Sequence, residues 1–357
     1  MPSTSSLPGV IPDAVPAGDP ADPRPADQLR TALAAALDGL PPRRAAAGVE
    51  RLIAHYRGPG PRTGAPALRD RADAVAYAAY RMPATFEAVA TALRALARRL
   101  PDWAPRRLLD LAGGTGAACW AAADVFGPAL TDVTVLDQAA DALRLGRDLA
   151  RGGPPALRAA QWRRQQFGAT TPELPEADLV TVSYLLGEVP ETTRHALLAA
   201  AAAAGRAVVV VEPGTPQGYA RVRAARQQLT AAGWRLVAPC PHGGECPITP
   251  GDDWCHFAAR VARSSLHRQV KGGSLGYEDE KFSYVAAVHP TLAPAEPPAH
   301  RIVRRPQYRK GMVLLDLCTD DGELRRTSVT RRHGARYRAA RAIGWGGDWP
   351  PSEADPR

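Results

Sequence analysis

The sequence of 357 residues lacks long apolar runs and an amino-terminal targeting pattern. No stretch reaches the roughly 18–20 apolar residues that a membrane-spanning helix needs. The longest candidate, "ALLAAAAAAGRAVVVVE", is interrupted by Gly205 and Arg206, and it predicts a helix followed by a buried strand. The first 23 residues contain no Lys or Arg, so neither a secretory signal nor a mitochondrial transit peptide is indicated. We therefore expect a cytoplasmic protein with no membrane partner.

Cysteine is also scarce, with five residues in the chain, yet three of them fall in one loop. In a reducing compartment so few cysteines argue against a disulfide framework and favour a metal or cluster site. The loop "PCPHGGECPITPGDDWCHF" contains Cys240, Cys246 and Cys255, and Cys318 ends the apolar stretch "MVLLDLC" further on. Its prolines and glycines favour tight turns that can point several thiolates inward.

Four thiolates suit either tetrahedral zinc or an iron–sulfur cluster. The gaps of five and eight residues between the first three cysteines are wider than the short paired gaps of most zinc sites. Wide, irregular gaps with a distant fourth cysteine are more often seen with clusters, although spacing alone leaves the choice nearly even. Zinc, with His242 or His256 as further ligands, and a loop without metal remain open alternatives.

Positive charge is concentrated near the carboxyl end. The formal net charge is +9, and residues 301–341 hold 12 Lys and Arg against 4 acidic residues, a local net charge of +8. Such an excess attracts polyanions, most often nucleic acid, although a solvated basic face gives the same pattern. The RNA-binding candidates of this segment are Arg304, Arg305, Arg309, Lys310, Arg331 and Arg332.

The sequence that follows the cysteine loop predicts a second basic feature, a helix over about 255–270. His256, Arg260, Arg263, His267 and Lys271 recur at steps of three and four residues, which places them on one face of a helix. Three of them, Arg260, Arg263 and Lys271, are therefore predicted to contact RNA phosphates. A solvated helix face is the alternative.

Residues 106–212 alternate apolar strands with helical patterns. This alternation predicts an α/β fold with a parallel sheet that is covered on both faces. The stretch "LLDLAGGTGAACW" reads as a strand, a Gly-rich turn and a helix, in which Gly114 and Gly116 allow a ligand to approach the backbone. Asp137 ends the next strand, where a carboxylate can accept hydrogen bonds from ribose hydroxyls. A turn without ligand is the alternative.

The order Asp110-x-Ala112-x-Gly114-x-Gly116 resembles the DxGxGxG motif of class I S-adenosylmethionine-dependent methyltransferases, with Ala112 in place of the first glycine. The resemblance implies that Asp110 helps to position the amino group of the cofactor. The cofactor-binding candidates are Asp110, Ala112, Gly114, Gly116, Asp137 and, after the fourth strand, Tyr184.

No catalytic residue can be assigned from the sequence. The position after the fourth strand reads "SYLLGEVPE" and lacks the Asn/Asp-Pro-Pro-aromatic motif that holds a target amine in nucleic-acid methyltransferases. Cys119 lies in the helix after the Gly-rich turn, where we expect a core residue rather than a nucleophile.

These patterns predict a class I methyltransferase (Rossmann-like) sheet with a helical amino-terminal cap, a cysteine-rich metal loop and a small β-rich carboxyl-terminal module. The expected segments are a disordered tail (1–27), a helical cap (28–104), a Rossmann-like domain that binds S-adenosylmethionine (105–235), a cysteine loop with the basic helix and a returning strand (236–290), a Pro-rich linker (291–300), a basic β-rich module (301–349) and a tail (350–357).

Several blocks in order resemble one known family. They include the cysteine block "PCPHGGECPITPGDDWCHFAARVARSSLHRQVKGGSLGYEDEKFSYVA" and "AYAAYRMPATF", "DLVTVSYLLGEV", "VVVVEPGTPQG", "RIVRRPQYRKGMVLLDLC" and "WGGDW", within about residues 45–349. The chain is similar to the methyltransferase-like proteins that assemble the small ribosomal subunit. The resemblance implies a class I methyltransferase fold and a 4Fe–4S cluster on Cys240, Cys246, Cys255 and Cys318.

The resemblance also implies a partner, the small-subunit ribosomal RNA or the pre-ribosomal small subunit, and we expect a monomer away from the ribosome. Two functions remain open: an S-adenosylmethionine-dependent enzyme that acts on ribosomal RNA, and a non-catalytic RNA-binding assembly factor with the same fold. A methyltransferase for a small molecule ranks last, because it gives the basic segment no role.

Overall fold

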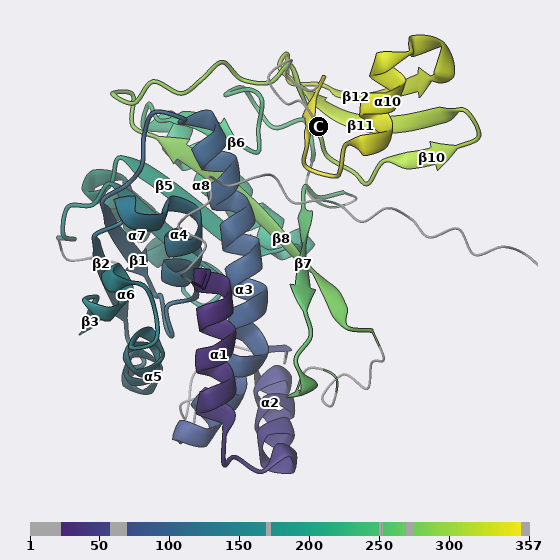
Figure 1. Ribbon diagram of the computed structural model, residues 1–357. Coiled ribbons are helices and arrows are strands. Elements are labelled where there is room, and N and C mark those ends of the chain that lie inside the picture. Colours follow the sequence, from purple (N-terminus) through teal and green to yellow (C-terminus); the bar gives the residue numbers. More distant parts are fainter. Residues whose placement is uncertain are drawn as a thin grey trace, which may run out of the picture.

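The computed structural model describes residues 23–57, 70–168, 173–249, 251, 253–266, 268 and 275–350. Within these residues the chain forms a large sheet covered by helices and a smaller sheet near the carboxyl end (Figure 1). No helix in this described part combines the length and the apolarity needed to cross a membrane.

The large sheet contains five parallel strands that alternate with helices. Its order β3-β2-β1-β4-β5 reverses next to β1, as in Rossmann-like folds, which confirms the predicted α/β class. The strands are β1 (Arg107–Leu111), β2 (Asp132–Asp137), β3 (Gln161–Arg164), β4 (Leu179–Ser183) and β5 (Ala207–Pro213). The helices between and after them are α4 (Ala117–Phe126), η1 (Gly127–Ala129), α5 (Ala140–Ala150), α6 (Pro155–Arg158), α7 (Glu191–Ala204) and α8 (Pro216–Ala231).

Both faces of this sheet are covered, because successive strand residues point to opposite sides. Leu108 of β1 is buried in a core with residues of α4 and α5, whereas its neighbour Leu109 belongs to a second core with Leu197 of α7 and Leu229 of α8. Strands that are buried on both faces carry the continuous apolar runs that the sequence shows.

Three amino-terminal helices pack on the first of these faces: α1 (Pro25–Leu37), α2 (Pro42–Arg57) and α3 (Arg71–Arg99). Asp70 caps α3 by accepting a hydrogen bond from the backbone N–H of Asp73 at 2.9 Å. Figure 1 shows α1 and α2 beside the long α3. α1 begins at Pro25, inside the predicted tail 1–27, while residues 1–22 and 351–357 lie outside the described part.

The far side of the large sheet extends beyond the predicted parallel part and corrects one prediction. Strand β8 (Tyr277–Val288) lies between β5 and β6 (Arg235–Ala238) and runs antiparallel to both, so the sheet is mixed and not parallel throughout. The first half of the segment predicted as a basic helix (about 255–270) forms strand β7 (Phe257–Ala262), which pairs with β8, whereas residues 265, 266 and 268 are helical. A short Ala-rich stretch fits both helical and strand periods, and the long β8 supplies the pairing partner that decides between them.

The smaller sheet consists of β9 (His300–Ile302), β10 (Gln307–Arg309), β11 (Met312–Thr319), β12 (Leu324–Thr330) and β13 (Asp348–Trp349). The helical turn η2 (Arg331–His333) and helix α10 (Ala335–Ala342) follow β12. These elements have their own core, which includes Leu315, Val329 and Trp349. β11 and β12 form an antiparallel hairpin that is joined by the turn "DDGE".

Arg301 of β9 connects this sheet to the cysteine loop. Its side chain is only 2% exposed, and it donates hydrogen bonds to the carbonyl oxygens of Pro239 at 2.8 Å and Gly346 at 2.7 Å. It also forms an ion pair with Asp348. A buried guanidinium with these partners fixes the smaller sheet against the loop that begins after β6.

Candidate functional site

The Gly-rich turn after β1 is held by carboxylates at the carboxyl edge of the sheet. Asp137 accepts hydrogen bonds from the backbone N–H of Gly114 at 2.8 Å and of Ala139 at 2.7 Å. Gly114 and Gly116 have φ of +54° and +83°, a region that glycine adopts without strain. The predicted cofactor residues of β1, β2 and the turn therefore meet at one edge of the sheet.

Asp110 lies under this turn and is fully buried. It accepts hydrogen bonds from the Thr181 hydroxyl at 2.8 Å and from the Cys119 thiol at 3.5 Å. Burial raises the pKa of Asp110 to about 7. Cys119 is thus a core residue of α4 that supports Asp110, as expected, and burial raises the pKa of its thiol as well.

Ala112 and Tyr184 adopt strained backbone conformations beside the turn. Their φ values of +53° and +57° lie in the left-handed region, which disfavours residues with a Cβ atom. Ala112 occupies the position of the first motif glycine, so the fold keeps the glycine conformation although the residue has changed. Strain of this kind clusters at functional sites.

Tyr184, at the carboxyl end of β4, is tied into a polar cluster with two residues distant in sequence. Its hydroxyl donates to the Glu280 carboxylate at 3.0 Å, and Arg81 of α3 pairs with the same carboxylate at 3.1 Å. The Arg81 guanidinium also lies 5.7 Å from the centre of the Tyr184 ring. Burial, together with the Glu280 carboxylate, raises the pKa of Tyr184, so its hydroxyl stays protonated.

The four cysteines predicted as ligands line one cavity between the large and the small sheet. Cys240, Cys246 and Cys255 come from the loop after β6, and Cys318 comes from β11. Cys119 is not part of it. The sulfur atoms, which are far apart in sequence, are therefore brought to one place by the packing of the two sheets.

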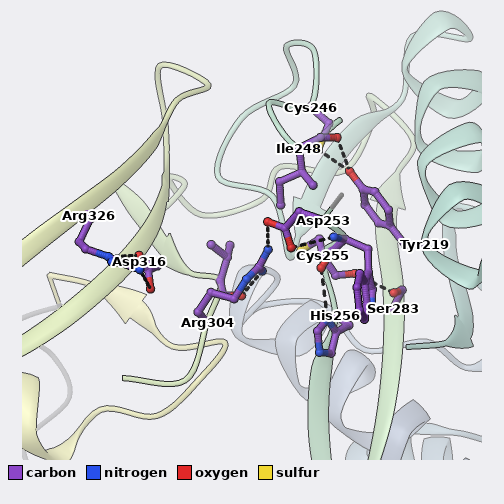
Figure 2. A network of polar contacts seen from close by, with 12 residues as sticks. Tyr219, Cys246, Ile248, Asp253, Cys255, His256, Ser283, Arg304, Asp316 and Arg326 are labelled. Atoms are coloured by element: carbon purple, nitrogen blue, oxygen red, sulfur yellow. Dashed lines mark hydrogen bonds and ion pairs between the residues drawn. The ribbon is translucent and has the colours of Figure 1, made fainter. Parts of the chain in front are cut away.

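The cysteine loop is fixed mainly from α8 and β8. Tyr219 donates to the carbonyl oxygen of Ile248 at 2.8 Å, and its hydroxyl lies 3.3 Å from the Cys246 sulfur (Figure 2). Ser283 donates to the carbonyl oxygen of Cys255 at 2.7 Å. Arg226 donates to the carbonyl oxygens of His242, at 3.2 Å, and of Gly244.

The cavity is apolar and lies near two arginines. Burial raises the pKa of the Cys240 and Cys255 thiols, and it raises the pKa of Cys318 to about 12. Arg226 and Arg301 act in the opposite direction on Cys240 and Cys318 because they favour the thiolate. The bare thiols of Cys240, Cys255 and Cys318 are therefore neutral, and a bound metal would have to deprotonate them.

The chemistry of the donor set fits a soft metal centre, since four thiols face one cavity next to cationic side chains. Among the described residues no three His, Cys, Asp or Glu side chains are close enough together to hold a single metal ion. The Cys318 sulfur lies 3.5 Å from Nε2 of His242, and His256 packs between Trp254 and Trp345. The arrangement itself thus does not distinguish zinc from a larger cluster.

The predicted RNA-binding residues fall into two groups. Arg260 pairs with Asp279, Arg263 with Glu278 and Arg304 with Asp253. The second group consists of predicted residues that are exposed and have no acidic partner among the described residues: Arg305, Arg309, Lys310, Arg331 and Arg332. Arg260 lies on strand β7 and not on a helix, so the predicted helical stripe is wrong over this strand. His267 and Lys271 lie outside the described part.

The sequence profile of the family described as mitochondrial small ribosomal subunit Rsm22 matches residues 71–350, which is most of the chain. The chain belongs to this family. The curated relatives include the human mitochondrial ribosome assembly protein METTL17, which is 29% identical over 295 residues, covering 76% of this chain and 61% of the relative. The Rsm22-cox11 tandem protein 2 of Schizosaccharomyces pombe is 26% identical over 189 residues, with 41% and 25% covered. The chain thus spans less than two thirds of these relatives.

Solved methyltransferase structures are similar only at the level of general architecture. An O-methyltransferase family protein from Burkholderia thailandensis has a TM-score of 0.41 and 14% identity, with 68% of each chain covered. An S-adenosylmethionine-dependent methyltransferase from Aquifex aeolicus has a TM-score of 0.34 and 13% identity, with 58% of this chain and 92% of the other covered. Similarity of this degree supports no conclusion about ligands or activity.

The cytoplasmic location predicted from the amino-terminal composition is contradicted by these comparisons. The Rsm22 family is described as mitochondrial, and both the human and the yeast relatives are named as mitochondrial proteins. They point to mitochondria instead. The composition of the first 23 residues misled the prediction, because the absence of a recognisable targeting pattern is a weak indicator.

Sequence reasoning did not find the side chains that surround the two sites of this Rsm22-family chain. Arg226, Arg301 and Tyr219 line the cysteine cavity, and Arg81 with Glu280 holds Tyr184. These residues lie in helices or strands whose partners are distant in sequence. A single sequence gives no signal for them, because it does not distinguish a buried arginine from an exposed one.

Proposed function

We propose that this chain binds S-adenosylmethionine at the turn after β1 and a 4Fe–4S cluster at Cys240, Cys246, Cys255 and Cys318, and acts on small-subunit ribosomal RNA during ribosome assembly. The observation that carries the proposal is the convergence of these four cysteines on one cavity in a chain of the Rsm22 family. Family membership supports the ribosomal partner, since METTL17 is named a ribosome assembly protein.

Within the first site, the turn would bind the cofactor chiefly through backbone N–H groups and the Asp137 carboxylate. Asp137 already accepts two backbone hydrogen bonds and keeps acceptor capacity for ribose hydroxyls. S-adenosylmethionine supplies an electrophilic methyl group when it is bound. Asp110 would support the turn from below while Thr181 fixes its carboxyl group.

In the second site, the cysteine thiolates would hold the cluster and the two arginines would offset its negative charge. A 4Fe–4S cluster separates its cysteine ligands more widely than one zinc ion does, because each cysteine binds a different iron. The arrangement of the described residues does not by itself decide between the two. Arg226 and Arg301 also hold the loop backbone, so the same side chains would both offset the charge of the cluster and fix the conformation of the cysteine loop.

A non-catalytic RNA-binding assembly factor is the second candidate. The polar cluster at the end of β4 favours it, because the Tyr184 hydroxyl is already bonded to Glu280 and Glu280 is already paired with Arg81. A side chain with its polar atom occupied in this way is poorly placed to act as a general acid or base.

The cluster is tested by purifying the protein without oxygen and measuring iron, sulfide, zinc and the visible absorption. We expect about four irons and four sulfides per chain in the wild type. Cys246→Ser should lose the colour and most of the iron. The matched control Cys119→Ser changes a buried cysteine outside the cavity and should keep both. A colourless wild type with one zinc per chain would replace the cluster by zinc.

The RNA partner and the reaction are tested separately from the cluster. Crosslinking in cells should recover small-subunit ribosomal RNA, and its absence from the crosslinked fraction would contradict the proposed partner. Incubation of the protein with labelled S-adenosylmethionine and immature small subunits then distinguishes the two candidates. Label transferred to RNA supports the enzyme, whereas cofactor binding without transfer supports the assembly factor.

A further inference from the structure

The smaller sheet carries a hollow of about 250 Å³ that is separate from the cysteine cavity. Its lining is formed by cationic and aromatic side chains, principally Tyr308, Arg309, Lys310, Arg331, Tyr337 and Arg341. No acidic residue lines it. The residues come from the hairpin β10–β11, from η2 and from α10, which Figure 1 shows grouped at the outer end of the molecule.

The hollow has a defined backbone frame. Gly311 makes the tight connection between β10 and β11 with φ of +74°, a conformation that suits glycine. The backbone N–H of Arg331 donates to the Gly311 carbonyl oxygen at 3.1 Å, which fixes η2 against this hairpin. Helix α10 packs on β11 and β12 through the buried Ala340 and places Tyr337 and Arg341 at the rim. The cationic groups are thus attached to ordered elements.

The charges in the hollow are not neutralised within the described part of the chain. Arg309, Lys310, Arg331 and Arg341 are exposed, and no Asp or Glu of that part lies within ion-pair distance of them. Other arginines of the same sheet differ: Arg326 pairs with Asp316 at 2.7 Å, and Arg325 pairs with Asp321 and Glu323. Four unneutralised cations of this segment therefore meet at the hollow, which suits an anionic ligand, while Arg305 and Arg332 lie outside its lining.

The aromatic side chains indicate which kind of anion fits. Tyr308 is 56% exposed, an unusual state for a large ring, and it lies on β10, whose pairing partner is β11. Tyr337 is half-buried in the same lining. Aromatic rings beside cationic groups are the common platform for single-stranded nucleic acid, because bases stack on the rings while phosphates contact the cations. Bases in a duplex are already stacked and cannot reach such a ring.

We propose that this hollow binds one unpaired nucleotide of single-stranded RNA, with the base stacked on Tyr308 and the adjoining phosphates held by Arg309, Lys310, Arg331 and Arg341. This inference rests on the proposed RNA partner and adds to it a location and a preference for unpaired RNA. It gives the exposed ring and the unneutralised charges a common role.

The test measures binding of the full-length protein to a short labelled single-stranded RNA and to a duplex of the same sequence, by fluorescence anisotropy over a series of salt concentrations. Tyr308→Ala should weaken single-strand binding by about 5- to 140-fold, the range expected for one base stacked on an aromatic ring. It should leave the salt dependence and the duplex affinity nearly unchanged. Tyr308→Phe keeps the ring and should bind as the wild type does.

The cationic groups are tested by the double variant Arg309→Ala/Arg331→Ala. It should reduce the slope of log K against log salt by about 1.4, because each lost phosphate contact on a single strand removes about 0.7. The matched control is Arg325→Ala, which removes an exposed but acid-paired arginine of the same sheet and should change the slope little. Thermal melting checks that each variant is folded.

The outcomes separate this inference from the proposed function. If the wild type binds RNA and immature small subunits but Tyr308→Ala binds as tightly, the hollow is not the site and only this inference fails. If Tyr308→Ala weakens duplex binding equally, or if the same variants lose binding to anionic lipid vesicles instead of RNA, the inference is also wrong. If the wild type binds neither RNA nor immature subunits, the proposed function fails with it.

Discussion

Replacing Arg301 by alanine should release the smaller sheet from the large one. The Arg301 guanidinium is almost fully buried and donates to the carbonyl oxygens of Pro239 at 2.8 Å and Gly346 at 2.7 Å. A hydrogen bond from a charged group contributes about 1.5–3 kcal/mol, and loss of the donor also leaves buried oxygens unsatisfied. The ion pair with Asp348 adds little to this sum, because the Asp348 side chain is 35% exposed. We expect a loss of about 3–5 kcal/mol in the free energy of unfolding.

The assay is urea unfolding followed by tryptophan fluorescence. Trp349 is a buried reporter in β13, the strand that pairs with Arg301 on β9. Arg325→Ala is the matched control, since Arg325 lies on the same sheet in an exposed ion pair, and it should change the free energy of unfolding by less than about 0.5 kcal/mol. The reasoning fails if Arg301→Ala loses less than about 1 kcal/mol, because the buried hydrogen bonds would then not hold the two sheets together.

Two further predictions concern the turn after β1. Ala112→Gly should raise the free energy of unfolding by about 0.5–1 kcal/mol in urea titrations, because relief of the left-handed strain outweighs the entropy cost of glycine; a destabilised variant would contradict the strain. The pKa of Asp110 is about 7 in the folded protein, against 3.8 for an ordinary aspartate, so the folded state binds more protons between these pH values. The free energy of unfolding should therefore fall as pH rises through this window, by at most about 1.4 kcal/mol per pH unit. Asp110→Asn lacks the titrating group, so its free energy of unfolding should fall less between pH 5 and pH 7 than that of the wild type in urea titrations. An equal fall in the variant and the wild type would refute this prediction.

The sequence was sufficient for the parallel half of the large sheet, because strands buried on both faces must carry continuous apolar runs. β1, β4 and β5 show such runs, and the helices between them show three- and four-residue spacing. The turn with Gly114 and Gly116 could be predicted from the sequence for a related reason. Positive φ angles and close packing restrict the residue type at these positions, so the backbone constraint is visible in the sequence.

The antiparallel half was predicted less well, because its structure depends on pairing between distant segments. The stretch that forms β7 has Phe257, Ala259 and Val261 buried at a period of two, but its basic residues also fit a helix. Only the partner strand β8 settles the choice, and a local pattern does not contain that information. The arginines that surround the cysteine cavity were missed for the same reason, since their partners lie on other elements.

The position of the cysteine cavity connects its chemistry to the docking of the two sheets. Cys318 lies near the end of β11, a central strand of the smaller sheet, whereas the other three cysteines follow β6 of the large sheet. Arg301 lies beside this cavity and joins the same two parts through its hydrogen bond to Pro239, while its bond to Gly346 lies within the smaller sheet. A cluster held as proposed would therefore act on the same interface as Arg301, and its loss should loosen the smaller sheet more than the core of the large one. Because the cationic hollow lies on the smaller sheet, the state of the metal site would then set how firmly the proposed RNA-binding surface is held to the rest of the molecule.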